Sequence, residues 1–437
     1  MLFDLGELRE LVRLEAVERF EEGFEVDVEA VERRVRAAAS GGELMEIYLE
    51  LQRAEPRRGY PYVEPTEWRE LVRERPAAPP RLVVDLSEGE LRDRILGAWL
   101  GRCAGCMAGK PVEGWSRERI ARALRRAGEY PLRGPYFPMA AFSDLSPEEQ
   151  RLLYPLTREG IRRAERDDDL DYTVLNLVVY ERRGPGFTTD DVAEAWLAML
   201  PYRLTYTAER AAYRNLVLGL KPPETATHLN PFREWIGAQI RADLWGYVSP
   251  GDAARASELA YRDARLSHVK NGVYGEMLVA AMLSLAYALD DPREIVREAL
   301  KAIPERSRLA EAVRYVLGLH ARGLEWEEAV GEVLGRYGGY HPVHTINNAA
   351  IVVAALLWGE GDFARTVTYA VMAGLDADCN GATAGSIAGM LSGASGLPRE
   401  WIEPLRGRLA TALSGLGELS VEELAERTLR CARVHQP

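Results

Sequence analysis

Hydrophobic residues recur with a helical period along most of the chain. Residues 28–38, VEAVERRVRAA, place apolar side chains on one face of a helix and charged side chains on the other. The same 3.6-residue spacing, between capping and stopping residues, marks further segments at 188–201, 251–268, 291–304, 307–323 and 325–338. No run of alternating polar and apolar residues indicates strands. The pattern predicts an all-α protein.

A change in composition near residue 80 divides the chain. Residues 1–80 are highly charged and end in RERPAAPP, a proline-rich stop. The following segment, SEGELRD, has the pattern of a helix start, with Ser87 as the N-cap and Glu90 at the capping-box position. We expect a helical extension over residues 1–80, with no evident chemistry, and one large multi-helix domain over residues 81–437.

The charge balance limits the class of partner. The 437 residues carry a net charge of -12, with a pI of about 5.3, so a nucleic acid would be repelled on average and is not expected as a partner. No stretch reaches the roughly 18 apolar residues of a membrane span. The N-terminus has acids where a signal peptide has a basic region. We therefore expect a cytoplasmic protein without a membrane partner; the sequence does not indicate an oligomeric state.

Two segments repeat glycine at every fourth position. One carries Gly97, Gly101, Gly105 and Gly109, and the other carries Gly381, Gly385, Gly389 and Gly393. This spacing aligns each set along one ridge of a helix, although glycine costs a helix about 1 kcal/mol relative to alanine. The ridges predict close backbone approach, through tight helix packing, through a helix that crosses beneath an active site, or through both.

Clustered aspartates are the strongest sign of chemistry. Asp167, Asp168 and Asp169 begin the segment DDDLDYT; alone, such acids are typical of a solvated first helical turn. Asp376 and Asp378, however, are the only acids between Arg365 and Arg399 and precede a glycine-rich apolar helix. Carboxylates in apolar surroundings need a counter-charge. The two groups together predict a site for one or two hard divalent cations, which can activate water for hydrolysis.

Polar residues also interrupt two apolar helix starts. The residues concerned are His268, Asn271 and Tyr274 in one segment and His341, His344 and Asn347 in the other. A single histidine in such a place is usually structural, whereas two in a loop marked by glycine and proline are better candidates for ligand contacts. Both interpretations stay open, and these six residues are the predicted substrate-binding set.

Three motifs, in this order, resemble the ADP-ribosylglycohydrolase family, which includes the dinitrogenase-reductase-activating glycohydrolases. They are GAWLGRCAGCMAGKPVEG, RDDDLDYT and GLDADCNGATAGSIAG, and the resemblance extends over about residues 91–401. It implies a single all-α domain with two Mg²⁺ or Mn²⁺ ions in a cleft. It also implies hydrolysis of an N- or O-glycosidic bond at the anomeric carbon of ADP-ribose.

The resemblance assigns roles to particular residues. The implied metal ligands are Asp168, Asp169, Asp376 and Asp378, with Asp167 as a fifth ligand and Cys379 at a further ligand position. Glu113 matches a family glutamate that orients water or gates the site, and the expected catalytic residues are Glu113, Asp168 and Asp378. His268 lies near the position of a family histidine. Residues 341–348 are expected to contact the adenine or the ribose.

Departures from the family motifs indicate a divergent subgroup with DDDxDYT and DxDCN sequences. Asp167 and Cys379 stand where the family has threonine, and Cys106 stands where it often has an acid. Because Mg²⁺ prefers oxygen to sulfur, whether Cys379 ligates stays open. Two alternatives follow: the same site cleaving another small N-glycoside or nucleoside-like metabolite, and a non-catalytic binding or structural relative. The retained aspartates favour an enzyme.

Overall fold

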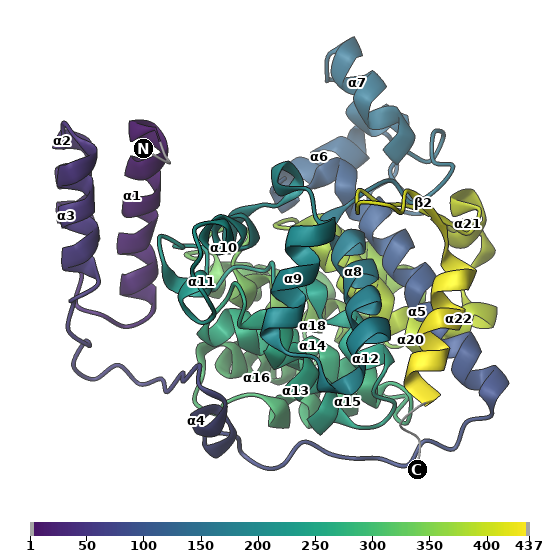
Figure 1. The fold of residues 1–437 in the computed structure, drawn as a ribbon. Helices are drawn as coiled ribbons and strands as arrows, with labels where there is room; N and C mark the ends of the chain where they lie inside the picture. The colour runs from purple at the N-terminus through teal and green to yellow at the C-terminus, as the bar shows by residue number, and fades with distance from the viewer. Residues whose placement is uncertain (1–3, 434–437) are drawn as a thin grey trace.

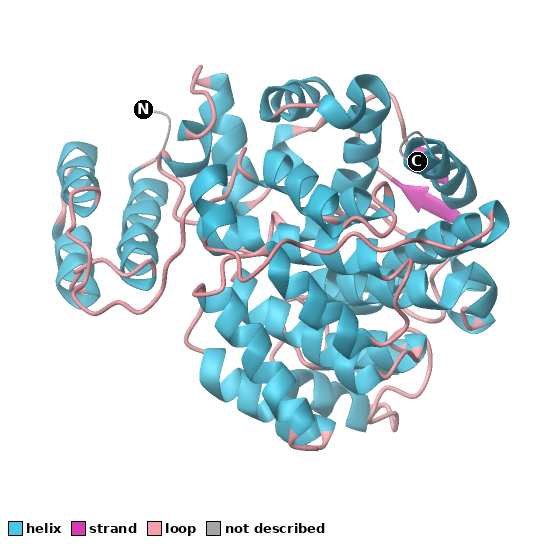
Figure 2. Ribbon diagram, turned by 90° about the horizontal axis from the view of Figure 1, so that it is seen from below, coloured by secondary structure: helices cyan, strands magenta, loops and turns pink. Residues whose placement is uncertain are grey.

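A computed structural model describes residues 4–433 of the chain. This part forms 22 α-helices, eight 3-10 helices and one small antiparallel sheet, in which β1 (Arg408–Ala410) pairs with β2 (Glu418–Ser420). Figure 2 shows how far helices dominate the molecule. The all-α prediction is confirmed. The two strands were not predicted, because three residues are too few to display an alternating pattern.

The first three helices form a group at the left of Figure 1 and contact the rest of the molecule through ion pairs such as that of Glu15 with Arg233. They are α1 (Leu5–Glu21), α2 (Val28–Ala37) and α3 (Gly41–Leu51), and α4 (Trp68–Arg73) follows them. These three helices share a small apolar core with members such as Val12, Val35 and Leu44. Helix α2 confirms the amphipathic pattern of residues 28–38.

The remaining helices form one body around a large common core. They are α5 (Glu88–Gly109), α6 (Arg117–Arg126), α7 (Pro147–Leu153), α8 (Asp168–Arg183), α9 (Thr189–Met199), α10 (Thr207–Val217), α11 (Glu224–Thr227), α12 (Asp243–Tyr247), α13 (Ala253–Ala264), α14 (Lys270–Leu285), α15 (Pro292–Ala299), α16 (Arg308–Ala321), α17 (Trp326–Tyr337), α18 (Thr345–Gly359), α19 (Phe363–Met372), α20 (Ala377–Gly396), α21 (Arg399–Ile402) and α22 (Val421–Arg433). The 3-10 helices are η1 (Lys110–Val112), η2 (Met139–Phe142), η3 (Tyr154–Leu156), η4 (Gly184–Gly186), η5 (Tyr202–Leu204), η6 (Gln239–Arg241), η7 (Leu300–Ala302) and η8 (Glu403–Leu405).

The predicted helix starts are confirmed at their caps. The Ser87 hydroxyl accepts a hydrogen bond from the Glu90 backbone N–H, and the Glu90 carboxylate accepts one from the Ser87 backbone in return. Thr188 and Asp191 make the same reciprocal pair at α9. Each box satisfies N–H groups that the first helical turn would otherwise leave unpaired.

The two glycine ridges pack directly against each other. A Cβ atom added to Gly105 would lie 1.9 Å from the carbonyl oxygen of Gly381, and one added to Gly101 would lie 2.1 Å from that of Gly385. Helix α5 therefore packs on α20 backbone to backbone, which confirms the predicted close approach. At one end of this contact Gly109 meets Ala377, so the C-terminus of α5 lies against the N-terminus of α20.

An extended segment links the N-terminal helices to α5 and runs along the bottom of Figure 1. The Val63 N–H donates to the Arg306 carbonyl at 3.0 Å, and the Leu82 N–H donates to the Gly251 carbonyl at 2.8 Å. The predicted boundary near residue 80 falls within this segment. Within residues 4–433, no helix is both long and apolar enough to cross a membrane.

Candidate metal centre and active site

A cavity of about 370 Å³ opens where α5 ends and where α8 and α20 begin. The glycine packing of α5 on α20 brings these ends together. The lining residues are Lys110, Glu113, Arg166, Asp167, Asp168, Tyr206, Thr207, Glu209, Trp235, Ile236, Gly237, Ile240, Val343, Asp376, Asp378 and Cys379. Five of the predicted aspartate and glutamate site residues thus line this cavity.

The first carboxylate group comes from the start of α8. Asp167 is the N-cap, and its side chain accepts from the Asp169 N–H at 3.0 Å. Asp168 is half-buried and lines the cavity. Asp169 lies fully buried behind it, where its Oδ1 accepts from the Arg102 guanidinium at 3.1 Å. The acids of this turn therefore differ: two face the cavity, and one is tied to the core.

The second carboxylate group comes from the start of α20. A tight turn precedes Asp376, with Gly374 and Leu375 both at positive φ (80° and 61°). The amide oxygen of Asn348 accepts from the Asp376 N–H at 3.2 Å and from the Asn380 side chain at 2.8 Å. Leu375 is the non-glycine residue of this pair, and its strained backbone needs support from its surroundings. The hydrogen bond of Asn348 to the next residue provides part of that support.

Glu113 approaches the second group from the loop after η1. The Gly114 N–H donates to the Leu375 carbonyl at 3.1 Å, which fastens this loop to the turn before Asp376. One carboxylate oxygen each of Glu113, Asp376 and Asp378 lies within 4.8 Å of the others. Glu113 belongs to an exposed turn, but its carboxyl faces the cavity. Desolvation there, and then the charges of Asp376 and Asp167, raise its pKa to about 7.

The crowded carboxylates fit a divalent cation. Burial and then the neighbouring acids raise the pKa of Asp168 and of Asp378 well above the ordinary value, so these groups resist ionising together. Asp378 Oδ1 and Asp169 Oδ2 are buried without a hydrogen-bond partner among the described residues. Carboxylate oxygens are the ligands that Mg²⁺ and Mn²⁺ prefer. The donor set therefore suits a hard cation, which would favour the ionised form of each acid.

Cys379 also lies at the cavity, and one ligand atom each of Cys379, Asp169 and Asp378 lies within 4.8 Å of the others. Burial and the surrounding acids raise the pKa of its thiol well above the ordinary value. A protonated thiol is a weak hydrogen-bond donor and a poor partner for a hard cation. The geometry thus brings Cys379 to the predicted place, while its chemistry disfavours it as a ligand.

The six predicted substrate-binding residues do not line this cavity. His268 lies behind the wall, with its Nδ1 2.8 Å from the Ser267 hydroxyl and 3.9 Å from Glu209 Oε1. Asn271 donates to Glu64 at 2.8 Å, and the Tyr274 hydroxyl donates to the Pro65 carbonyl. These contacts hold the extended segment on the domain, which gives Asn271 and Tyr274 a structural part.

His341 and His344, in the loop before α18, lie outside the cavity lining, although Val343 between them is part of it. His341 stacks on Trp235 with ring centroids 4.0 Å apart, and the Asn347 amide donates to the His341 carbonyl at 3.0 Å. His344 caps α18 through Nδ1, which accepts from the Ile346 N–H at 3.1 Å. These residues shape the loop instead of pointing into the cavity.

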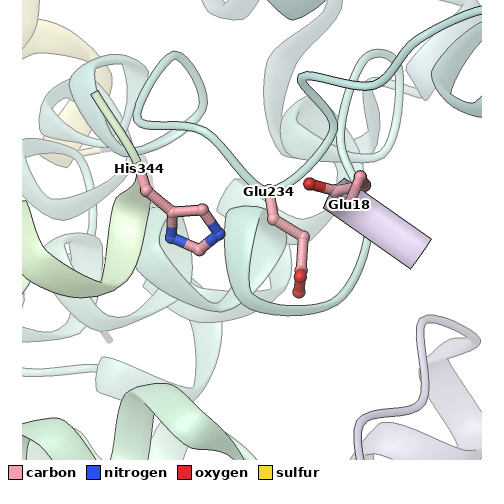
Figure 3. Close-up of side chains that lie close together, drawn as sticks. All are labelled: Glu18, Glu234 and His344. Carbon is pink, nitrogen blue, oxygen red and sulfur yellow. The ribbon is translucent and has the colours of Figure 1, made fainter. Parts of the chain in front are cut away.

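His344 lies close to Glu18 and Glu234, as Figure 3 shows. Such a trio has the residue types of a metal site. However, because His344 Nδ1 accepts a hydrogen bond, a neutral ring carries its proton on Nε2. The ring therefore turns an N–H toward the two acids, and this arrangement does not present a ligand nitrogen.

Several cavity residues were not predicted from the sequence. Lys110 forms an ion pair with Asp167, and Arg166 binds Asp171 at 2.7 Å. Trp235, Tyr206 and Glu209 come from segments without a recognisable motif. Lys110 stands three residues before Glu113, so the two charged residues of KPVEG could have indicated Lys110 as a further site residue. The other residues reach the cavity through long-range packing, which the local sequence does not reveal.

A helical domain with convergent carboxylates in a cavity has the donor groups of a metal-binding site. The family model of the ADP-ribosylglycohydrolases matches residues 87–436, and the chain belongs to this family of metal-dependent glycohydrolases. A solved structure described as an ADP-ribosylglycohydrolase-related protein complex matches with a TM-score of 0.53 and 22% identity. That match covers 80% of this chain and 100% of the other, and at this identity it supports the fold alone. No curated protein matches the chain.

Proposed function

We propose that this protein hydrolyses a glycosidic bond at the anomeric carbon of ADP-ribose and depends on Mg²⁺ or Mn²⁺. The observation that carries the proposal is that Asp168, Asp376 and Asp378 line one cavity, where a buried carboxylate oxygen of Asp378 has no hydrogen-bond partner among residues 4–433. Family membership supports the reaction class.

Each carboxylate has a distinct place in the proposed reaction. Asp168, Asp376 and Asp378 would hold the cation, which supplies positive charge to position ribose hydroxyls and the attacking water. Glu113, whose carboxylate oxygen lies within 4.8 Å of those of Asp376 and Asp378, is placed to accept a proton from that water. Asp167 is paired with Lys110, whereas Asp169 bonds Arg102 through Oδ1 and has an Oδ2 without a hydrogen-bond partner among the described residues, so Asp169 could add a further ligand oxygen.

The remaining wall suits a nucleotide-like substrate. Trp235 and Tyr206 offer aromatic surface for a base or a sugar. Arg166 is half-buried beside them, and its guanidinium can face a phosphate while it remains bonded to Asp171. An aromatic surface and a cation in one cavity suit the base and the phosphates of an ADP-ribosyl group.

A second candidate is a smaller N-glycoside or nucleoside-like metabolite cleaved by the same carboxylates. The specific observation in its favour is size. The cavity volume of about 370 Å³ lies near the lower end of the roughly 300–1,000 Å³ typical of small-molecule sites.

The test is a product assay with Mg²⁺ and with Mn²⁺, using ADP-ribose glycosides and simple nucleosides as substrates and mass spectrometry for detection. Free ADP-ribose supports the first proposal, and a simpler free sugar supports the second. Asp378→Asn should abolish the activity, whereas Asp190→Asn, an exposed aspartate at the start of α9, should leave it unchanged. An intact metal-loaded protein that cleaves neither class would contradict both proposals and leave a non-catalytic relative.

A further inference from the structure

A second cavity, of about 400 Å³, lies between α10 and helix α1 of the N-terminal extension, which are neighbours in Figure 1. Thr207, the first residue of α10, lines both this cavity and the carboxylate cavity. The aromatic walls also meet, because Phe232 of the second cavity packs edge-on against Trp235 of the first, with ring centroids 4.9 Å apart. We call the second cavity the α1 groove; its lining residues are Glu7, Glu10, Leu11, Tyr202, Thr207, Arg210, Arg214 and Phe232.

The α1 groove contains a guanidinium without a carboxylate partner. Arg210 is exposed and donates to a backbone carbonyl at 3.2 Å, but it forms no ion pair with any acid among residues 4–433. The two acids of the groove are engaged within α1, where Glu7 accepts from the Asp4 N–H at 3.1 Å and Glu10 pairs with Arg13 at 2.7 Å. The Arg210 guanidinium is therefore available for an anionic group of a ligand.

Aromatic surface surrounds this guanidinium. The central carbon of the Arg210 guanidinium lies 5.9 Å from the ring centre of Tyr202 and 5.7 Å from that of Tyr206. Both tyrosines are strongly exposed for aromatic residues, at 43% and 44%. An exposed aromatic ring can stack on a nucleic base while a neighbouring guanidinium binds phosphate.

A second guanidinium continues this surface into the carboxylate cavity. Arg166 lines that cavity and lies 3.5 Å from the hydroxyl of Tyr206, whose ring is next to Arg210. Tyr202 and Phe232 line the groove but not the carboxylate cavity. From the carboxylates outward, the groups thus follow one another as acid, guanidinium, guanidinium and aromatic ring. The ribose that carries the scissile bond, the diphosphate and the base follow one another in the same order in ADP-ribose.

We infer that the α1 groove binds the adenosine diphosphate end of the substrate. Arg166 and Arg210 face the diphosphate, and the rings of Tyr202 and Phe232 face the base. This inference rests on the proposed function and adds to it a binding site that the extension helps to form. Helix α1 lies outside residues 87–436, so the family domain alone does not form this groove. The groove favours the ADP-ribosyl substrate over a simple nucleoside, because a nucleoside has no diphosphate.

The test is isothermal titration calorimetry of the full chain with ADP and with adenosine, in EDTA so that the result does not depend on a metal at the carboxylates. ADP should bind the wild type more tightly than adenosine does. Arg210→Met should weaken ADP binding about 10-fold and leave adenosine binding unchanged, because it removes a charged donor to phosphate. Arg182→Met, which changes an exposed arginine in the last turn of α8, is the matched control and should bind ADP as the wild type does.

Two further variants test the aromatic surface and the part played by α1. Tyr202→Ala should weaken the binding of ADP and of adenosine alike, by about 10-fold, because it removes stacking surface. Glu7→Gln should tighten ADP binding about threefold, because it removes a negative charge from the groove. Misfolding does not produce tighter binding, so this variant tests the contribution of α1 independently of folding.

The outcomes separate this inference from the proposed function. The inference is overturned if ADP binds no more tightly than adenosine, or if Arg210→Met and Arg182→Met lose equal affinity. Unchanged ADP affinity in Glu7→Gln would overturn the part assigned to the extension. The expected binding pattern in a protein that cleaves neither class of glycoside would support the nucleotide groove and contradict the proposed hydrolysis.

Discussion

The packing of α5 on α20 predicts a large penalty for a single methyl group at Gly105. The added Cβ would lie 1.9 Å from the Gly381 oxygen, whereas a carbon and an oxygen normally stay about 3.3 Å apart. The helices would have to separate locally by roughly 1.4 Å. Both atoms are held by helical backbone, so neither can yield as a side chain would. Overpacking of about 3 kcal/mol, less about 1 kcal/mol of improved helix propensity, gives a net loss of about 2 kcal/mol for Gly105→Ala.

Urea unfolding followed by circular dichroism measures this loss, and Gly318→Ala in α16 is the matched control. A Cβ at Gly318 meets nothing within 4 Å, so the same substitution should stabilise the protein by up to about 1 kcal/mol. If Gly105→Ala unfolds at the same urea concentration as the wild type, or later, the close backbone approach is not present in solution and the explanation of the glycine ridges fails.

Three further predictions concern buried polar groups. Arg102→Met should cost about 3–5 kcal/mol in urea unfolding, because Asp169 and Asp243 lose a buried partner; a loss below 1 kcal/mol would show that water reaches both acids. Burial raises the pKa of Glu21 to about 8, which is above its pKa in the unfolded chain. The protonated carboxyl therefore contributes fully to stability at a pH below the unfolded pKa. This contribution is lost as the pH rises through the folded pKa. Glu21→Gln should therefore stabilise by about 1–3 kcal/mol at pH 8 and have little effect at pH 4; equal effects at both pH values would refute this assignment. Asn348→Ala should weaken manganese binding about 10-fold without changing the ligands, and unchanged affinity in a titration would show that the turn before Asp376 supports itself.

The elements that were predictable are those specified by neighbouring residues. Capping boxes such as Ser87 with Glu90 need only residues three positions apart, and the period of apolar residues identifies helices before any partner is known. The glycine ridges also predicted a tertiary contact. Because glycine destabilises a helix, its repetition at one spacing implies that another element packs closely there. Asp376 and Asp378 could be predicted as site residues for a similar reason, since their surroundings in the sequence are almost free of charge.

The substrate-binding prediction depended on information that the local sequence does not hold. Asn271 stands at the start of an apolar helix as a ligand residue could, yet its side chain binds Glu64, 207 positions away. Tyr274 likewise finds its acceptor at Pro65, 209 positions away. In the sequence, a polar residue that is free to bind a ligand cannot be distinguished from one that makes a structural hydrogen bond. Only the folded structure shows which of these residues a distant segment covers. Trp235 shows the converse, because no motif marks it and packing alone brings it to the cavity.

The N-terminal helices act on the cavity through the segment that contains Trp235. Arg233 is buried against α1, where it binds Glu15 and Glu22 at 2.8 Å each. Two residues later, Trp235 lines the cavity and stacks on His341. A displacement of α1 would leave the Arg233 guanidinium buried without its carboxylates, which is costly, so the wall segment and α1 must move together. We therefore expect the extension, which has no chemistry of its own in the sequence, to help hold Trp235 in the cavity lining.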